Sequence, residues 1–201
     1  YADMVTAFKL TGEMDSALHY YKLSQEIAKQ TNNQYLMAKN YLNVANIYNK
    51  KGNNEKALEH YGKSLEISRS ENIDYGKYIN FLNIGQLYLE NSQTKKAIEF
   101  FHKALEVASQ IESVNMIELY NNLYLGYKKS GNTEKALLYH EKLLSLKDSL
   151  AETQKHQEIM ELQTKYNTAK NQARILKLET KQIRSQVLRN YLIAGLVIMF
   201  L

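Results

Sequence analysis

The chain has 201 residues with no proline, no cysteine and no tryptophan, and only 8 glycines. The lack of cysteine excludes disulfides, thiolate metal sites and a cysteine nucleophile. Because proline and glycine are the strongest helix breakers, their scarcity favours long uninterrupted helices. The net charge of +5 lies in the tail: residues 1–150 carry 18 Lys and Arg against 17 Asp and Glu, whereas residues 151–201 carry 8 against 4.

An internal repeat is the main signal in the sequence. The same pattern returns around Ala17, Ala57, Ala97 and Ala136, at spacings of 40, 40 and 39 residues. Each copy predicts a hairpin of two antiparallel helices. A small residue such as Ala57 lets the two helices approach closely, and an aromatic residue such as Tyr48 fills the adjoining space.

Glycine and capping residues mark the turns inside the hairpins. Gly52 and Gly131 fall just past a first helix, where a left-handed residue ends the helix at low cost. Asn54, Thr94 and Thr133 are the predicted N-caps of the second helices. Turns between hairpins are expected near residues 31–33, 71–74 and 112–113.

The stretch from Asn43 to Tyr48, followed by Lys51 to Leu58, carries a resemblance to a known family. The chain resembles the tetratricopeptide repeat (TPR) proteins, although their usual period is about 34 residues and often includes a proline. We attribute the longer period here to longer helices. The resemblance implies an all-α solenoid with four hairpins, over residues 1–31, 34–71, 75–111 and 114–147.

A solenoid of this kind presents a concave face formed by the first helix of each hairpin, and partner binding is its default use. The family's groove positions, placed by register, predict the lining residues. They are Lys39, Leu42, Asn46, Asn49, Lys50, Leu82, Gln86, Leu89, Asn121, Leu125 and Lys128. Such a surface suits an extended peptide or a partner helix, with asparagine bonding the peptide backbone and lysine meeting a carboxylate. The alternative is a solvated face with no ligand.

A helical stalk is predicted over residues 148–190, where no glycine or proline occurs. Heptads counted from Ile159 place mainly apolar or small residues on one seam. They are Ile159, Leu162, Tyr166, Ala169, Ala173, Leu176, Ile183 and Val187. This pattern favours a weak coiled coil, and we expect a parallel homodimer. The alternatives are a helix that folds back along the repeats and a lone charged helix.

The last eleven residues, 191–201, contain no charge. Tyr191 stands at the polar edge of this run, and Lys181, Arg184 and Arg189 precede it. Aromatic and basic residues in these places are typical of a membrane entry, so we expect the start of a transmembrane helix. The alternative is a buried core helix, because a spanning helix needs about 20 apolar residues.

The whole chain also resembles the end of certain bacterial sensors, on the segments Leu146–Leu150 and Glu161–Tyr166 and the basic helix that leads into Tyr191. In those proteins a TPR array, usually periplasmic, precedes a stalk, one transmembrane helix and a cytoplasmic histidine kinase or LuxR-type DNA-binding domain. The resemblance implies a signalling protein of the bacterial inner membrane, with the array in the periplasm. A static membrane adaptor and a cytosolic peptide-responsive TPR regulator are the alternatives.

No catalytic motif is present in the sequence, so we expect no enzyme in this part of the protein. His19, His60, His102 and His140 recur about 40 residues apart on second helices, so they are expected on different turns and not in one metal site. Phosphate loops, nucleophile elbows and zinc-protease pairs are missing. We expect no cofactor and no nucleic-acid contact, because a membrane explains the basic tail.

Overall fold

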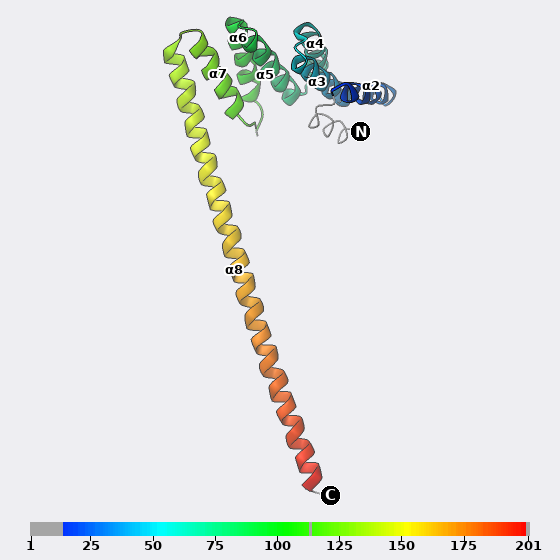
Figure 1. Cartoon of the computed structure of the whole chain (residues 1–201), viewed down its shortest axis with the longest axis vertical. Helices are drawn as coiled ribbons and strands as arrows, with labels where there is room; N and C mark the ends of the chain where they lie inside the picture. The colour runs from blue at the N-terminus through cyan, green and yellow to red at the C-terminus, as the bar shows by residue number, and fades with distance from the viewer. Residues whose placement is uncertain (1–13, 113, 200–201) are drawn as a thin grey trace. The chain divides into compact units, whose positions relative to one another are not determined.

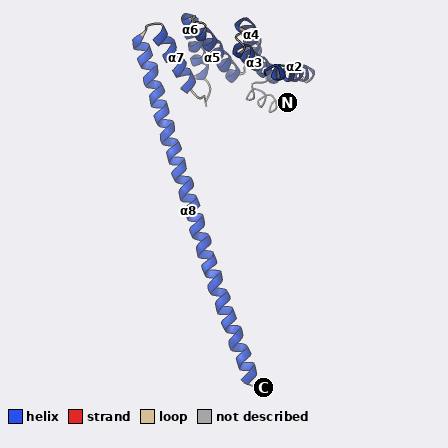
Figure 2. Ribbon diagram, in the orientation of Figure 1, coloured by secondary structure: helices blue, strands red, loops and turns tan. Residues whose placement is uncertain are grey.

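The computed structural model describes residues 14–112 and 114–199. Within them all regular secondary structure is helical (Figure 2), which confirms the all-α prediction. The helices are α2 (Met14–Gln30), α3 (Gln34–Lys50), α4 (Asn54–Ser70), α5 (Asp74–Glu90), α6 (Thr94–Ala108), α7 (Ile117–Lys129) and α8 (Thr133–Met199). The chain divides into two compact units, Tyr1–Lys147 and Asp148–Leu201, and the boundary lies within α8.

The first unit is a stack of helical hairpins. Short turns join the helices, so each helix packs against its neighbour in the chain, as Figure 1 shows for α3 with α4 and for α5 with α6. In addition, α3 contacts α5, and α5 contacts α7. The first helices of successive hairpins therefore form one continuous layer, which is the arrangement of a solenoid and confirms the predicted architecture.

The short turns between helices share one hydrogen-bonded motif. After α3, the Gly52 N–H donates to the Asn49 carbonyl and the Asn53 N–H donates to the Tyr48 carbonyl, both at 2.9 Å. Gly52 has a φ of +73°, which suits a residue without a Cβ. The same pair of bonds recurs at four other residues with positive φ, namely Asn32, Asn72, Ser92 and Gly131.

At three of these five turns the residue after the positive-φ position caps the next helix with its side chain, whereas Ile73 and Gln93 make no such hydrogen bond. The side chain of Asn53 accepts a hydrogen bond from the Lys56 N–H at 3.1 Å, which satisfies one free donor at the start of α4. Asn33 and Asn132 do the same for α3 and α8. Because a single residue ends the turn and caps the next helix, no further linker residue is needed. The sequence prediction placed the caps one residue too late, at Asn54, Thr94 and Thr133.

Small and aromatic residues meet at the centre of each hairpin. Ala57 and Ala97 are fully buried, and Tyr61 and Phe101 lie one turn further along with 1% and 0% of their surface exposed. A Cβ added to Gly85 would lie 2.6 Å from two ring atoms of Phe101. Burial of such a ring contributes up to about 3 kcal/mol to the free energy of folding. The ring fits only because the facing helix carries a small residue at the point of contact.

An aromatic stack flanked by lysine recurs across the hairpins. An aromatic ring of the second helix packs on a tyrosine of the first at centroid distances of 5.3 to 5.6 Å, and a lysine lies over the same tyrosine at 5.2 to 5.3 Å. These contacts join the two helices near the turn. The three sets are Tyr48, His60 and Lys56; Tyr88, Phe100 and Lys96; and Tyr127, Tyr139 and Lys135.

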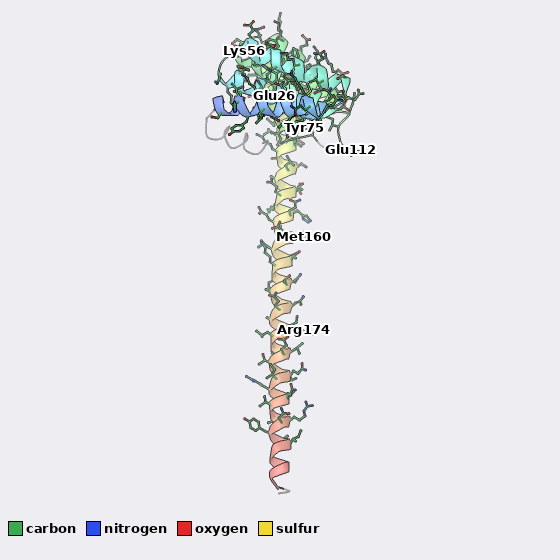
Figure 3. The ribbon with its side chains drawn as sticks, turned by 90° about the vertical axis from the view of Figure 1, so that its right-hand side faces the viewer. Glu26, Lys56, Tyr75, Glu112, Met160 and Arg174 are labelled. Atoms are coloured by element: carbon green, nitrogen blue, oxygen red, sulfur yellow. The ribbon has the colours of Figure 1, made fainter. Side chains whose placement is uncertain are left out.

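Helix α8 belongs to both units. Ala136, Tyr139 and Leu143 are buried in the first unit, at 6%, 6% and 4% exposure. From residue 148 to residue 193 every side chain is exposed, and side chains stand out around the helix at Met160 and Arg174 in Figure 3. The apolar members of the predicted seam are therefore open to solvent in the single chain, and their pairing stays a prediction.

The predictions of membrane anchoring and of a periplasmic array in the inner membrane are wrong. No helix in residues 14–112 and 114–199 has the length and apolar character that crossing a bilayer requires. Within the described residues the uncharged run covers only 191–199, and Arg184 and Arg189 precede it closely. A spanning helix needs about 20 apolar residues. Residues 200 and 201 of the predicted segment lie outside the described residues.

Candidate peptide-binding face

The predicted groove residues lie on the layer formed by α3, α5 and α7. Between α5 and α7 this layer is hollowed by about 560 Å³, and we call this space the α5–α7 hollow. Four of the residues that register placed in the groove line it, namely Gln86, Leu89, Leu125 and Lys128. Glu90, Asn122 and Lys129 complete the lining.

The cations of the α5–α7 hollow are held by neighbouring groups. Lys129 Nζ donates to the Leu89 carbonyl oxygen at 3.1 Å, which ties α7 to the end of α5. Lys128 Nζ donates to the Tyr124 hydroxyl at 3.3 Å and lies 5.5 Å from the centre of that ring. Because these contacts hold the two ammonium groups beside the hollow, less side-chain entropy would be lost when they meet an anionic group.

Asn122 is the distinctive polar residue of this hollow. It is 6% exposed, and its side-chain nitrogen Nδ2 has no hydrogen-bond partner. An unpaired buried donor costs about 1–3 kcal/mol, so the site gains when an acceptor arrives. The sequence prediction chose the neighbouring Asn121. The signal that could have found Asn122 is its recurrence with Asn43 and Asn83, at spacings of 40 and 39 residues.

A second hollow, of about 290 Å³, lies between α3, α4 and α5, and we call it the α3–α5 hollow. It takes in two further predicted groove residues, Lys39 and Leu42. Its other lining residues are Tyr35, Ala38, Asn43, Ser64, Ser68, Ile73, Tyr75, Gly76 and Ile79. Tyr75 lies at the edge of the array opposite Lys56, as the labels in Figure 3 show.

The remaining predicted residues line neither hollow. Asn46 Oδ1 accepts hydrogen bonds from the Tyr61 hydroxyl at 2.5 Å and from Asn83 Nδ2 at 3.1 Å, so this side chain holds two hairpins together. Leu82 is 2% exposed and belongs to the core. The others stay on the surface layer without lining a hollow, half-buried at Asn49 and Asn121 and exposed at Lys50.

The histidines take part in packing. His60 stacks on Tyr48, its Nδ1 atom is buried without a hydrogen-bond partner, and burial together with nearby Lys63 lowers the pKa of His60 below its ordinary value. The imidazole Nε2 of His102 lies 2.6 Å from the Tyr127 hydroxyl. In the described parts of the chain, no group of three His, Asp or Glu residues is placed to hold a metal ion.

Comparison with known proteins defines the class. The family model described as tetratricopeptide repeat matches residues 3–72 and 78–149. The chain therefore belongs to the tetratricopeptide repeat family, whose hairpin arrays form protein-interaction domains. A search of curated proteins found no match.

Two solved structures illustrate the shared fold. BtubC (BKLC) from P. vanneervenii has 19% sequence identity and a TM-score of 0.67, over 74% of this chain and 62% of that one. A putative kinesin light chain from Podosopora anserina with nearly identical TPR-like repeats has 14% identity and a TM-score of 0.60, over 73% of each chain. The present chain thus spans less than two thirds of BtubC, and the likeness to both concerns the fold alone.

Proposed function

We propose that the face formed by α3, α5 and α7 binds an extended segment of a partner protein, with the α5–α7 hollow as the main contact. The observation that carries this proposal is the buried amide of Asn122, whose Nδ2 has no acceptor within the fold. Because Nδ2 is itself buried, the carbonyl of a bound segment would reach it once the side-chain amide turns toward the hollow. Leu125, which is 38% exposed, offers apolar contact in the same hollow, and Lys128 offers a cation for a carboxylate.

Neighbouring asparagines provide a sharp test. A peptide selected from a random library on the wild-type chain serves as the probe, and its Kd is measured by fluorescence anisotropy. Asn122→Leu removes the donor while keeping a similar volume, and loss of a hydrogen bond of about 1.4 kcal/mol weakens binding about tenfold. Asn121→Leu is the matched control, because Asn121 lines neither hollow. Circular dichroism verifies that both variants stay folded.

The opposite result would place the site elsewhere. If Asn121→Leu weakens the peptide and Asn122→Leu leaves its Kd unchanged, the α5–α7 hollow is not the binding site. The register prediction for Asn121 would then be the better guide to the groove.

We also propose that the stalk, residues 148–190, pairs with a second copy of the chain. Isolated helices are marginally stable in water, and an apolar stripe sustained over several heptads is normally covered by another helix. Here Leu162, Leu176 and Ile183 are 61 to 66% exposed in the single chain. A second identical stripe is the simplest cover for them.

The charges beside the seam favour a parallel pair. Lys170, Lys177 and Arg184 each follow a seam residue by one position. In an antiparallel pair in which Lys177 faces its own copy, Lys170 of each chain would face Arg184 of the other, so like charges would meet, which is unfavourable. In a parallel pair Glu179 of one copy faces Arg184 of the other, which is a favourable contact. Lys165 of one copy then faces Lys170 of the other, which is the single like-charge contact among these positions.

Self-association separates a sensor from a static adaptor. A sensor must bind its ligand differently in two states, whereas an adaptor need not. Thermodynamic linkage between two binding events is reciprocal. If dimerisation changes the peptide Kd by some factor, saturating peptide must change the dimer dissociation constant by the same factor per binding site. A sensor should therefore show a peptide-dependent dimer constant. We favour the sensor, and sedimentation with and without peptide decides. An unchanged dimer constant at saturating peptide would favour the adaptor.

A further inference from the structure

We call the packing of hairpin α3–α4 against α5–α6 the first joint, and that of α5–α6 against α7–α8 the second joint. The two joints differ at one repeat position. Ala38 in α3 and Tyr78 in α5 are 40 residues apart and occupy the same place in successive hairpins. Tyr78 is 3% exposed, and its hydroxyl donates to the Asn115 carbonyl oxygen at 3.3 Å. Its ring packs in the same cluster as Ala104 and Ala108 of α6. At the second joint, the phenol ring of Tyr78 thus bridges the hairpin to the next one.

At the first joint the same place has no ring. Ala38 takes the repeat position of Tyr78. Gly76 lies 39 residues before Asn115, within α5, whereas Asn115 lies in the turn before α7. Ser64 and Ser68 take the places of Ala104 and Ala108. Ala38, Gly76, Ser64 and Ser68 all line the α3–α5 hollow. The hollow therefore lies at the repeat position whose counterpart at the second joint carries the tyrosine ring of Tyr78.

The floor of the α3–α5 hollow requires no polar occupant. Ser64 Oγ donates to the Ala38 carbonyl oxygen and accepts from Asn80 Nδ2, both at 2.8 Å. Ser68 Oγ donates to the Ser64 carbonyl oxygen at 2.8 Å. Because the polar groups of these serines are satisfied within the fold, an apolar group can cover them without leaving them unpaired.

The rim of the hollow is aromatic and carries a cation. Tyr35 and Tyr75 are 60% and 58% exposed, and Lys39, which is also exposed, belongs to the same lining. Exposed tyrosine rings offer edge and face contacts to another ring. An ammonium group is attracted to the face of a ring or to a phenol oxygen.

We propose that the α3–α5 hollow receives an aromatic side chain of the bound protein segment, in the way that the second joint receives the ring of Tyr78. This inference rests on the proposed binding of an extended segment by the α3, α5 and α7 layer, and it names the residue class that the ligand supplies. A phenol or phenyl ring matches the site in shape and chemistry, because the fold itself places such a ring at the equivalent joint.

p-Cresol, the side chain of tyrosine in isolation, is the probe. It is titrated into the full chain, and binding is followed by backbone amide NMR shifts. We expect saturable shifts at Ala38, Ser68 and Gly76 in the wild type. Ala38→Tyr fills the hollow from within, so these shifts should disappear while the melting temperature stays the same or rises. Tyr78→Ala opens the second joint, and p-cresol should then also shift the amides around Asn115 and raise the melting temperature of that variant.

The outcomes separate this inference from the proposed function. If p-cresol gives no saturable shift at the hollow of the wild type, or if Ala38→Tyr binds it as the wild type does, the aromatic site is refuted. Loss of peptide affinity in Asn122→Leu together with unchanged peptide affinity in Ala38→Tyr would also refute it, while leaving the proposed groove in place. Should p-cresol bind as expected but no peptide bind the chain, the groove proposal alone would fail.

Discussion

The strongest quantitative prediction concerns the stalk seam. Leu176 and Ile183 occupy equivalent seam positions of successive heptads and are 66% and 61% exposed in the single chain. In a dimer both copies bury them, so four side chains leave water. At about 2 kcal/mol per fully buried Leu or Ile, they contribute about 8 kcal/mol. Replacing both by Asp removes this term and places four carboxylates in an apolar seam, which weakens the dimer by more than about five orders of magnitude.

Sedimentation velocity over a range of concentrations measures the effect. The wild type should show concentration-dependent dimers, and Leu176→Asp with Ile183→Asp should sediment as a monomer at every concentration. The matched control is Leu178→Asp with Ser185→Asp, which adds the same charge to the same helix two residues further along and away from the seam. A monomeric wild type, or a control that dissociates as fully as the seam variant, would refute the coiled-coil reasoning.

Two other predictions concern the hairpins. Burial and nearby Lys63 lower the pKa of His60 in the folded chain, so the unfolded chain binds more protons and wild-type stability falls as the pH drops below about 6.5. His60→Phe copies the aromatic residue of the next hairpin and removes the titrating group. Its melting temperature should fall less between pH 7 and pH 5 than that of the wild type. An identical fall in both proteins would contradict the role of His60. Gly85→Ala forces a Cβ against the ring of Phe101 and should cost about 1–3 kcal/mol in urea unfolding, more than the roughly 1 kcal/mol gained in helix propensity. Gly62→Ala, with nothing within 4 Å of its added Cβ, should instead stabilise, and equal destabilisation of both would contradict the packing argument.

The repeat could be predicted from the sequence because the spacing of small and aromatic residues dictates how helices pair. The 40-residue period also indicated long helices, which are 17 residues in α2 to α5. The caps were misplaced because register does not show that one residue, such as Asn53, both ends a turn and starts the next helix. The turn hydrogen bonds of the backbone decide that question.

The candidate site was less predictable than the fold. Register places Asn46 on the binding layer, but only the three-dimensional packing brings its side-chain Oδ1 to the Tyr61 hydroxyl and to Asn83 Nδ2. Likewise, Ala38 and Tyr78 are equivalent by spacing, and the hollow arises from the difference in their volume. Such differences between copies depend on three-dimensional packing across the joint, which a period alone does not describe.

Photo-crosslinking tests the central claim of partner recognition most directly. Benzoylphenylalanine placed at Leu125, in the α5–α7 hollow, is irradiated with the selected peptide, and the crosslinked product is located by mass spectrometry. The same group at Glu106, an exposed residue of α6 outside both hollows, is the control. We predict crosslinking from position 125 and none from position 106; crosslinking from position 106 alone would contradict the proposal that the layer of α3, α5 and α7 binds the partner.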